Sequence, residues 1–146
     1  LTREGDIFGK IFSSIAPSII GMEMLKQAIA YLLFEGVTKV MPDGTVNRGT
    51  INVLCMSDPG MAKTVLLQFV VRISPRGVFA IATTATSVGL IAPLRKDEST
   101  GTWAIEAGAY MLASGGVLCL DEIGELSKDD FKSLHEAMEN GEVHIT

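Results

Sequence analysis

The sequence predicts an α/β fold built around a parallel β-sheet, and three observations support this prediction. An apolar run at residues 51–56 leads through a loop of small residues into a helix-like run at residues 65–72. Residues 78–82 have the apolar pattern of a second core strand. A third apolar run, residues 117–120, ends in two adjacent carboxylates. Strands that alternate with helices along a chain are typical of a parallel sheet covered by helices.

Local patterns predict the remaining elements. Residues 6–18 have helix-like apolar spacing and lead into a helix from about 22 to 34. The turn Pro42-Asp43-Gly44 predicts a hairpin over residues 40–48.

Two further elements are predicted nearer the C-terminus. Residues 91–105 form a second hairpin, because Asp97 to Gly101 supply turn residues between two extended runs. Ser127 begins a capping signature for a helix that ends near Asn140 and Gly141.

Residues 57–64 have the layout of a phosphate-binding loop. The residues are Ser57, Asp58, Pro59, Gly60, Met61, Ala62, Lys63 and Thr64. A loop between a strand and a helix directs backbone N–H groups at an anion. In such loops the lysine reaches the β- and γ-phosphates, and the hydroxyl after it holds Mg²⁺. The strict pattern has glycine at the positions of Ser57 and Ala62, so only part of the motif is present.

Asp121 and Glu122 follow the apolar run at residues 117–120 directly. Carboxylates at the end of a buried strand need partners. In a nucleoside triphosphatase the aspartate organises the Mg²⁺ shell, and the glutamate orients or deprotonates the attacking water. The alternative is a solvated strand end in which Asp121 stabilises the next turn. The candidate catalytic residues are therefore Lys63, Asp121 and Glu122, and the candidate metal ligands are Thr64 and Asp121.

Beyond these two motifs, further stretches of the chain agree in order and spacing with one known family. The whole chain resembles the first part of the AAA+ ATPase domain of minichromosome maintenance (MCM) replicative helicases. The stretches are Ile15–Gly21, Leu32–Val37, Pro42–Thr45, Arg48–Gly49, Ser74–Gly77, Val88–Leu90, Ile105–Ala109 and His135–Glu139. Other AAA+ groups, such as magnesium-chelatase subunits and bacterial transcription activators, are disfavoured by the Pro-Asp-Gly-Thr and His-Glu-Ala-Met-Glu blocks.

The resemblance implies a P-loop NTPase fold: a three-layer αβα arrangement with a parallel sheet and a helix-2 insert hairpin, incomplete at its C-terminus. Residues 1–146 are then a partial AAA+ core. Residues 1–50 hold the N-terminal helical segment and hairpin, and residues 51–90 hold the phosphate-loop strand, its helix and a second strand. The insert hairpin covers residues 91–107, and the Walker B strand and following helix cover residues 108–146.

The same resemblance implies the function. ATP with Mg²⁺ is hydrolysed between subunits of a homo- or hetero-oligomeric ring, a hexamer in the family, and hydrolysis drives DNA unwinding in replication. Ile20 stands where the family often has a tyrosine near the base. The insert hairpin is thought to engage DNA, and Arg95 and Lys96 are the basic residues near it. The implied location is intracellular: cytoplasmic in an archaeon and nuclear in a eukaryote.

Departures from the family pattern favour a divergent member. Ser57 adds a Cβ where backbone often approaches phosphate, which predicts weaker nucleotide affinity. Residues 80–87 lack the usual Gly-Lys. An alternative function is therefore a non-catalytic interaction module that binds helicase subunits or assembly factors.

In the resembled fold, several parts of the site come after the position of Thr146: sensor 1, the arginine finger, the lid, and the strand between the Walker A and Walker B strands. A fragment or a decayed homologue is therefore expected. Otherwise residues 142–146 or a partner fill the missing strand position, or the two flanking strands pair directly. The isolated chain is expected to hydrolyse ATP slowly or not at all.

Composition limits the possible partners. The net charge is −5, which argues against general nucleic-acid affinity. Residues 1–96 hold ten basic and six acidic residues, whereas residues 97–146 hold two and eleven, so any nucleic-acid contact must be local. The sequence has no apolar stretch near the ~18 residues of a membrane span, so no membrane partner is expected.

The cysteines and histidines are expected to have structural roles. Cys55 and Cys119 lie in apolar runs and are predicted to be buried free thiols of a reducing compartment. His135 and His144 have no second ligand at metal spacing, so they are expected to be structural or solvated.

Overall fold

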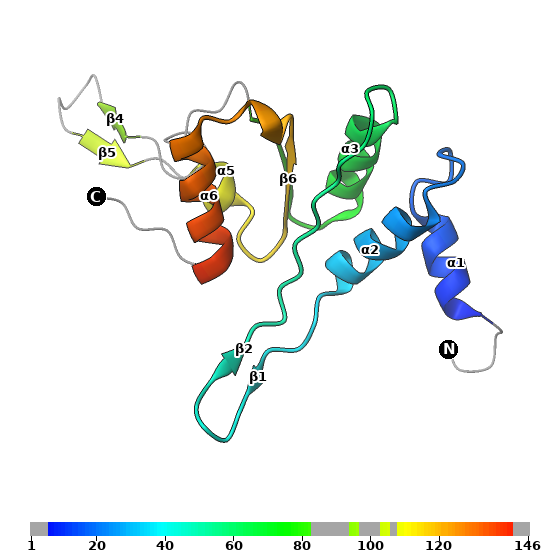
Figure 1. The fold of residues 1–146 in the computed structure, drawn as a ribbon, viewed down its shortest axis with the longest axis horizontal. Coiled ribbons are helices and arrows are strands. Elements are labelled where there is room, and N and C mark those ends of the chain that lie inside the picture. The colour runs from blue at the N-terminus through cyan, green and yellow to red at the C-terminus, as the bar shows by residue number, and fades with distance from the viewer. Residues whose placement is uncertain (1–5, 83–93, 97–102, 106–107, 142–146) are drawn as a thin grey trace. The chain divides into compact units, whose positions relative to one another are not determined.

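A computed structural model describes residues 6–82, 94–96, 103–105 and 108–141 of the chain (Figure 1). The chain divides into two compact units, Leu1–Phe69 and Val70–Thr146, and each is described by itself. Helix α3, Lys63–Ile73, begins in the N-terminal unit and ends in the C-terminal one. No helix of the described residues has both the length and the apolar character needed to cross a membrane.

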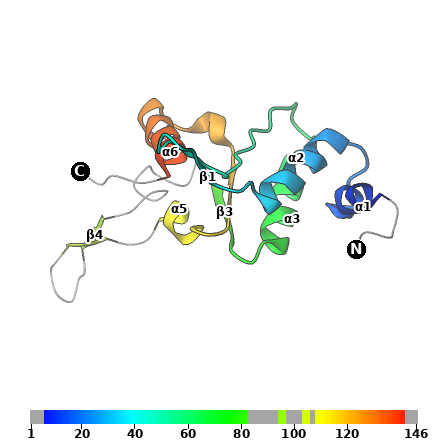
Figure 2. The same ribbon diagram turned by 90° about the horizontal axis from the view of Figure 1, so that it is seen from below.

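Two helices begin the N-terminal unit: α1, Ile7–Ser14, and α2, Glu23–Phe34. They contact each other (Figure 2), and the rings of Phe12 and Tyr31 meet edge to face with centroids 6.0 Å apart. Asp6 caps α1, since its carboxylate accepts from the backbone N–H of Gly9 at 2.9 Å. Both helices were expected from the apolar spacing, and both predictions are confirmed.

Lys26 is the buried charged residue of α2. Its ammonium donates to the carbonyl of Ile19 at 2.6 Å. Because an unpartnered buried cation is strongly unfavourable, this contact ties the connection between the helices to the face of α2.

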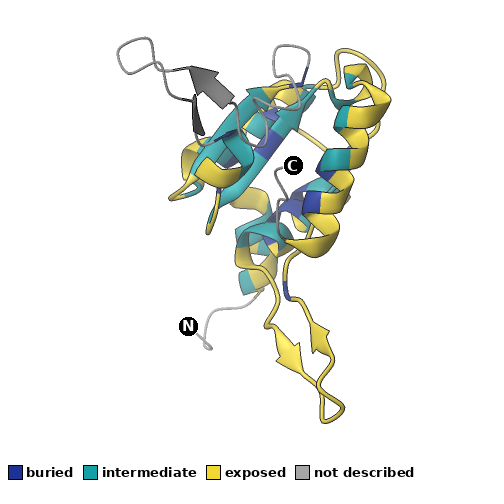
Figure 3. Cartoon of the chain, turned by 90° about the vertical axis from the view of Figure 1, so that its left-hand side faces the viewer, coloured by how far each residue is buried: buried dark blue, intermediate teal, exposed yellow. Residues whose placement is uncertain are grey.

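A short antiparallel hairpin follows, with β1 at Lys39–Val40 and β2 at Val46–Asn47. The Asp43 carboxylate accepts hydrogen bonds from the hydroxyl and the N–H of Thr45. These two bonds, the hydroxyl's first, lower the pKa of Asp43 from its ordinary value of 3.8. Both strands are exposed (Figure 3). The hairpin predicted around Pro42-Asp43-Gly44 is confirmed.

The C-terminal unit contains a parallel pair of strands, β3 at Gly77–Ile81 and β6 at Val117–Asp121. Gly77 lies opposite Val117, and Ile81 lies opposite Asp121. A parallel sheet, a strand at residues 78–82 and the strand that runs into Asp121 were predicted, but the pairing of these two strands was not. Helix α5, Ala109–Leu112, contacts β3.

Helix α6, Lys128–Asn140, begins at Ser127, whose hydroxyl accepts from the N–H of Asp130 at 3.2 Å. The helix ends at Gly141 in the left-handed conformation, as the capping signature predicted. Leu134 and Ala137 are its buried residues. The hydroxyl of Tyr110 donates to the carbonyl of Ala137 at 2.7 Å, which joins α5 to α6.

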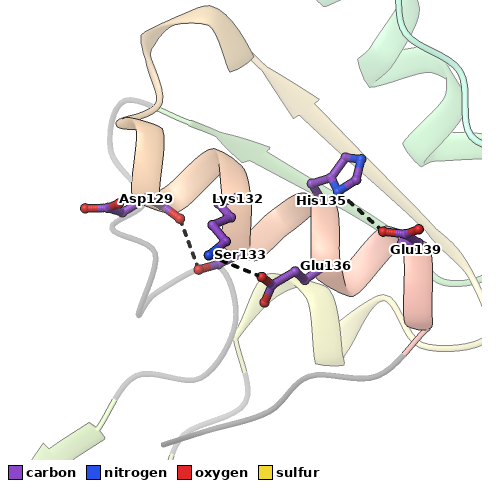
Figure 4. Close-up of polar contacts among 6 residues, drawn as sticks. All are labelled: Asp129, Lys132, Ser133, His135, Glu136 and Glu139. Carbon is purple, nitrogen blue, oxygen red and sulfur yellow. Dashed lines mark hydrogen bonds and ion pairs between the residues drawn. The ribbon is translucent and has the colours of Figure 1, made fainter.

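The exposed part of α6 carries polar contacts one turn apart (Figure 4). Lys132 and Glu136 are 3.8 Å apart, and His135 and Glu139 are 3.7 Å apart. His135 therefore lies among solvated charges on this helix. His144 lies outside the described residues.

Both strands of the second predicted hairpin are present in the structure. β4, Leu94–Lys96, pairs antiparallel with β5, Trp103–Ile105. The predicted turn at residues 97–101 lies outside the described residues. The assignment of this hairpin as a helix-2 insert remains a prediction.

The strand predicted at residues 51–56 is wrong, because the structure has no strand there. A strand exists through hydrogen bonds to a neighbour, and no strand of the described residues pairs with this run. Direct pairing of this run with the strand ending at Asp121 stays a prediction, and within the C-terminal unit β6 pairs with β3. Residues 142–146, the other proposed occupant of that position, lie outside the described residues.

Candidate nucleotide-binding site

The loop at residues 57–64 turns sharply into α3 through two left-handed residues. Gly60 has φ of 81°, and a Cβ built there meets nothing within 4 Å. Ala62 has φ of 53°, which costs a residue with a side chain about 1–2 kcal/mol. The carbonyl of Ala62 accepts the first helical hydrogen bond from the N–H of Leu66 at 3.0 Å. At the start of an α-helix the first N–H groups have no acceptor within the helix.

Lys63 folds back over the start of this loop. Its ammonium donates to the carbonyl of Ser57 at 2.7 Å and to the carbonyl of Asp58 at 2.9 Å. It also donates to the hydroxyl of Ser57 at 3.1 Å. The three contacts fix a positive charge beside the exposed loop.

The other predicted loop residues are mostly exposed. Ser57, Asp58, Pro59, Gly60, Met61 and Thr64 are exposed, and Ala62 and Lys63 are half-buried. Exposed N–H groups at a helix start, a lysine and a hydroxyl form a donor set that fits a polyphosphate. Ile20, predicted near the base, is also in the N-terminal unit and is 97% exposed.

Cys55 precedes the loop and is half-buried, and it does not lie in a strand, which corrects the expectation of a buried, mid-strand thiol. Burial raises the pKa of the Cys55 thiol above its ordinary value of 9.0, and the charge of Lys63 partly offsets that rise. Cys119 is buried in β6, as predicted. Neither cysteine forms a disulfide bond within the described residues.

The second half of the predicted site lies at the carboxyl end of β6. The carbonyl of Asp121 accepts from the N–H of Ala82 at 2.9 Å, which extends the parallel ladder to the last residue of the strand. The N–H of Glu122 donates to the carboxylate of Asp121 at 2.9 Å and fixes its orientation. Asp121 is half-buried and Glu122 is exposed. Ligands of parallel α/β sheets bind outside this end of the strands.

Glu122 has a left-handed backbone, with φ of 57°. Strained backbone of this kind is concentrated at functional sites. A 3₁₀ turn, η1, Ile123–Glu125, starts directly after it. The residue type of Glu122 was predicted to matter, but no feature of the sequence indicates its conformation.

Thr64 in the N-terminal unit and Asp121 in the C-terminal unit each carry oxygen atoms of the kind that binds Mg²⁺, which is usually held by one or two carboxylates, waters and substrate phosphates. The described residues contain no group of three or more His, Cys, Asp or Glu side chains that could hold a metal ion. Arg95 and Lys96 are placed by their backbone alone, opposite Ala104 and Trp103 in the β4–β5 ladder.

Comparison with known proteins identifies the family. The protein-family model of the MCM P-loop domain matches residues 1–146 of the chain. The chain belongs to the MCM family. Family membership implies a P-loop NTPase fold, to which the parallel β3–β6 pair conforms.

The relatives of this MCM-family chain include eukaryotic and archaeal proteins. It is 42% identical to the DNA replication licensing factor Mcm5 of Drosophila melanogaster over 99% of its length, and 44% identical to Drosophila Mcm3 over 100%. It is 43% identical to the minichromosome maintenance protein MCM of Saccharolobus solfataricus over 99%. The chain spans about a fifth of the length of these relatives. The resemblance described from the sequence is therefore confirmed at the level of the family.

Proposed function

We propose that this chain is the ATP–Mg²⁺-binding part of an MCM-type helicase subunit that acts in DNA replication. The observation that supports the proposal is the loop at residues 57–64, where the Lys63 ammonium lies against loop oxygens at the start of α3. Membership of the MCM P-loop family and the replication names of the relatives support the same function.

Each predicted residue has a role that follows from its chemistry. Lys63 would neutralise the β- and γ-phosphates, and loop residues 57–62 would donate backbone N–H groups to them. Thr64 and Asp121 would hold Mg²⁺, which supplies charge neutralisation to the phosphates when bound. Glu122 would accept a proton from, or orient, the attacking water. Ile20 would lie near the base.

The wider assembly is also part of the proposal. The chain would work in an oligomeric ring in which a neighbouring subunit supplies the arginine for hydrolysis. Alone, it would therefore hydrolyse ATP slowly or not at all. The β4–β5 hairpin, as a helix-2 insert, would touch DNA through Arg95 and Lys96.

Calorimetric titration with ATP and Mg²⁺ tests the proposal. Wild-type protein is expected to bind, and Lys63→Ala is expected to weaken binding by about tenfold or more, because a hydrogen-bonded charge contact contributes roughly 1.5–3 kcal/mol. Lys132→Ala is the matched control: it removes an equal charge from α6, where the side chain is 77% exposed.

Equal affinity of wild type and Lys63→Ala would contradict the assigned role of the loop. Absence of binding in every variant would instead favour the non-catalytic interaction module. A circular dichroism spectrum of each variant confirms that the comparison is made between folded proteins.

A further inference from the structure

Lys63 donates three hydrogen bonds, two to backbone carbonyls and one to a side-chain hydroxyl. The carbonyls of Ser57 and Asp58 belong to the backbone and are present whatever residues stand there. The third acceptor, the hydroxyl of Ser57, exists because this position is a serine. It is also the longest of the three contacts, at 3.1 Å against 2.7 and 2.9 Å.

A lysine ammonium has three N–H donors and no acceptor. With three loop oxygens around it, Lys63 can contact a phosphate only by exchanging or sharing one of these bonds. The longest bond, to the Ser57 hydroxyl, is the one that a charged phosphate oxygen most readily replaces, because hydrogen bonds between charged groups are stronger than those to a neutral hydroxyl.

The backbone of Ser57 is not strained. Ser57 is not among the non-glycine residues of the described chain that have positive φ, in contrast to Ala62. Its Cβ therefore carries no left-handed strain that a glycine would relieve. The hydroxyl remains as the feature of this side chain that acts on Lys63.

We propose that the Ser57 hydroxyl competes with phosphate for Lys63 and so lowers the affinity of this loop for nucleotides. The inference deepens the proposed function and rests on it. It assigns Ser57 as a positioning residue that sets affinity through Lys63. It gives an electrostatic reason for weak affinity beside the steric one expected from the sequence, and the variants below separate the two.

Ser57→Ala tests the inference, because alanine keeps the Cβ and removes the hydroxyl. We expect ATP and ADP to bind about three- to tenfold more tightly, as expected for the net contribution of one exposed hydrogen bond. AMP, which has no β- or γ-phosphate for Lys63 to reach, should bind equally to both proteins. Ser13→Ala, which removes an exposed hydroxyl of α1, should change none of these affinities.

Ser57→Gly separates the hydroxyl from the Cβ. If the hydroxyl is the cause, glycine and alanine should tighten ATP binding to a similar extent. A gain with glycine alone would restore the steric explanation and overturn the inference.

The remaining outcomes are also distinct. Unchanged affinity in Ser57→Ala, with wild type binding ATP, would refute the competition and leave the proposed function intact. Weaker binding would mean that the hydroxyl donates to the phosphate, which also refutes it. If neither wild type nor Ser57→Ala binds ATP, ADP or AMP, the proposed function fails and the inference fails with it.

Discussion

Lys63 is the side chain whose surroundings determine most about the candidate site. It lies at the first position of α3, follows a left-handed residue, and holds its ammonium against the oxygens of Ser57 and Asp58. The same charge acts on Cys55, whose thiol pKa it lowers against the effect of burial. Cys55 can therefore report on Lys63.

Lys63→Ala should raise the pKa of the Cys55 thiol further, because the variant removes the charge that favours the thiolate and leaves the burial that disfavours it. At the same pH, the variant then has a smaller thiolate fraction at Cys55 than wild type. Alkylation of Cys55 by iodoacetamide is therefore slower in the variant, and its pH profile moves to higher pH. The rate is followed by mass spectrometry of the peptide that contains Cys55.

Lys63→Arg is the control, since it keeps the charge and should leave the alkylation profile close to that of wild type. Faster alkylation of Lys63→Ala would contradict the electrostatic link between the two side chains. Cys119, which is buried in β6, should stay slow in all three proteins.

Residue types and their spacing were enough to predict where the candidate site residues lie along the helices and strands. Lys63 and Thr64 follow a loop of small residues, and Asp121 and Glu122 end an apolar run, so their placement at a helix start and a strand end follows from pattern alone. The left-handed backbones of Ala62 and Glu122 were not predictable, because neither residue type favours that conformation. The hydrogen bond between Lys63 and the Ser57 hydroxyl depends on the side-chain conformation of Lys63, so it was not predicted from the sequence either.

At the scale of elements, the register of β3 and β6 positions the acidic pair. The ladder begins where the carbonyl of Arg76 accepts from the N–H of Val117 at 3.0 Å, and it ends at Asp121. Gly116 lies at the start of this ladder. A Cβ built on Gly116 would overlap the carbonyl oxygen and the Cβ of Arg76.

Gly116→Ala should therefore destabilise the C-terminal unit by about 1–3 kcal/mol, the usual cost of overpacking. Urea unfolding should show a lower midpoint with an unchanged slope. Gly124→Ala is the matched control, because a Cβ built on Gly124 meets nothing within 4 Å, and its effect should stay within about 0.5 kcal/mol. Equal stability of the two variants would mean that the start of the ladder is not closely packed.

Helices and hairpins with local signals were predictable, whereas one strand was not. Asp43 in its turn and Ser127 at its helix start act within a few residues, so the sequence around them is sufficient. An apolar run such as residues 51–56 has the composition of a strand, but composition does not supply the neighbour that a strand needs. A local sequence pattern therefore predicts a strand correctly only where a neighbouring strand is available to pair with it.

At the scale of the whole molecule, charge limits how the chain could meet DNA. The net charge is −5, and residues 97–146 hold eleven of the seventeen acidic residues. The proposed contact through the β4–β5 hairpin must therefore rest on few phosphate neutralisations. Each one contributes a slope of about −0.9 to the dependence of log affinity on log salt.

Binding of the chain to duplex DNA should accordingly weaken with salt with a slope no steeper than about −2, the value for two phosphate contacts. The double variant Arg95→Ala, Lys96→Ala should lose this binding in a fluorescence anisotropy titration. The double variant Lys128→Ala, Lys132→Ala changes the net charge equally and should retain it. A steeper slope in wild type, or equal losses in the two variants, would place the contact elsewhere.

The left-handed backbone at Glu122 has a consequence for how this chain can change by mutation. Glycine or asparagine would adopt that conformation at lower cost than glutamate, by about 1 kcal/mol, and folded proteins are stable by only about 5–15 kcal/mol. Selection for heat resistance alone would therefore favour replacing the carboxylate proposed to act on water. In a library of variants selected for thermostability alone, we expect Glu122 to be replaced. In a library selected for both thermostability and hydrolysis, we expect Glu122 to be retained.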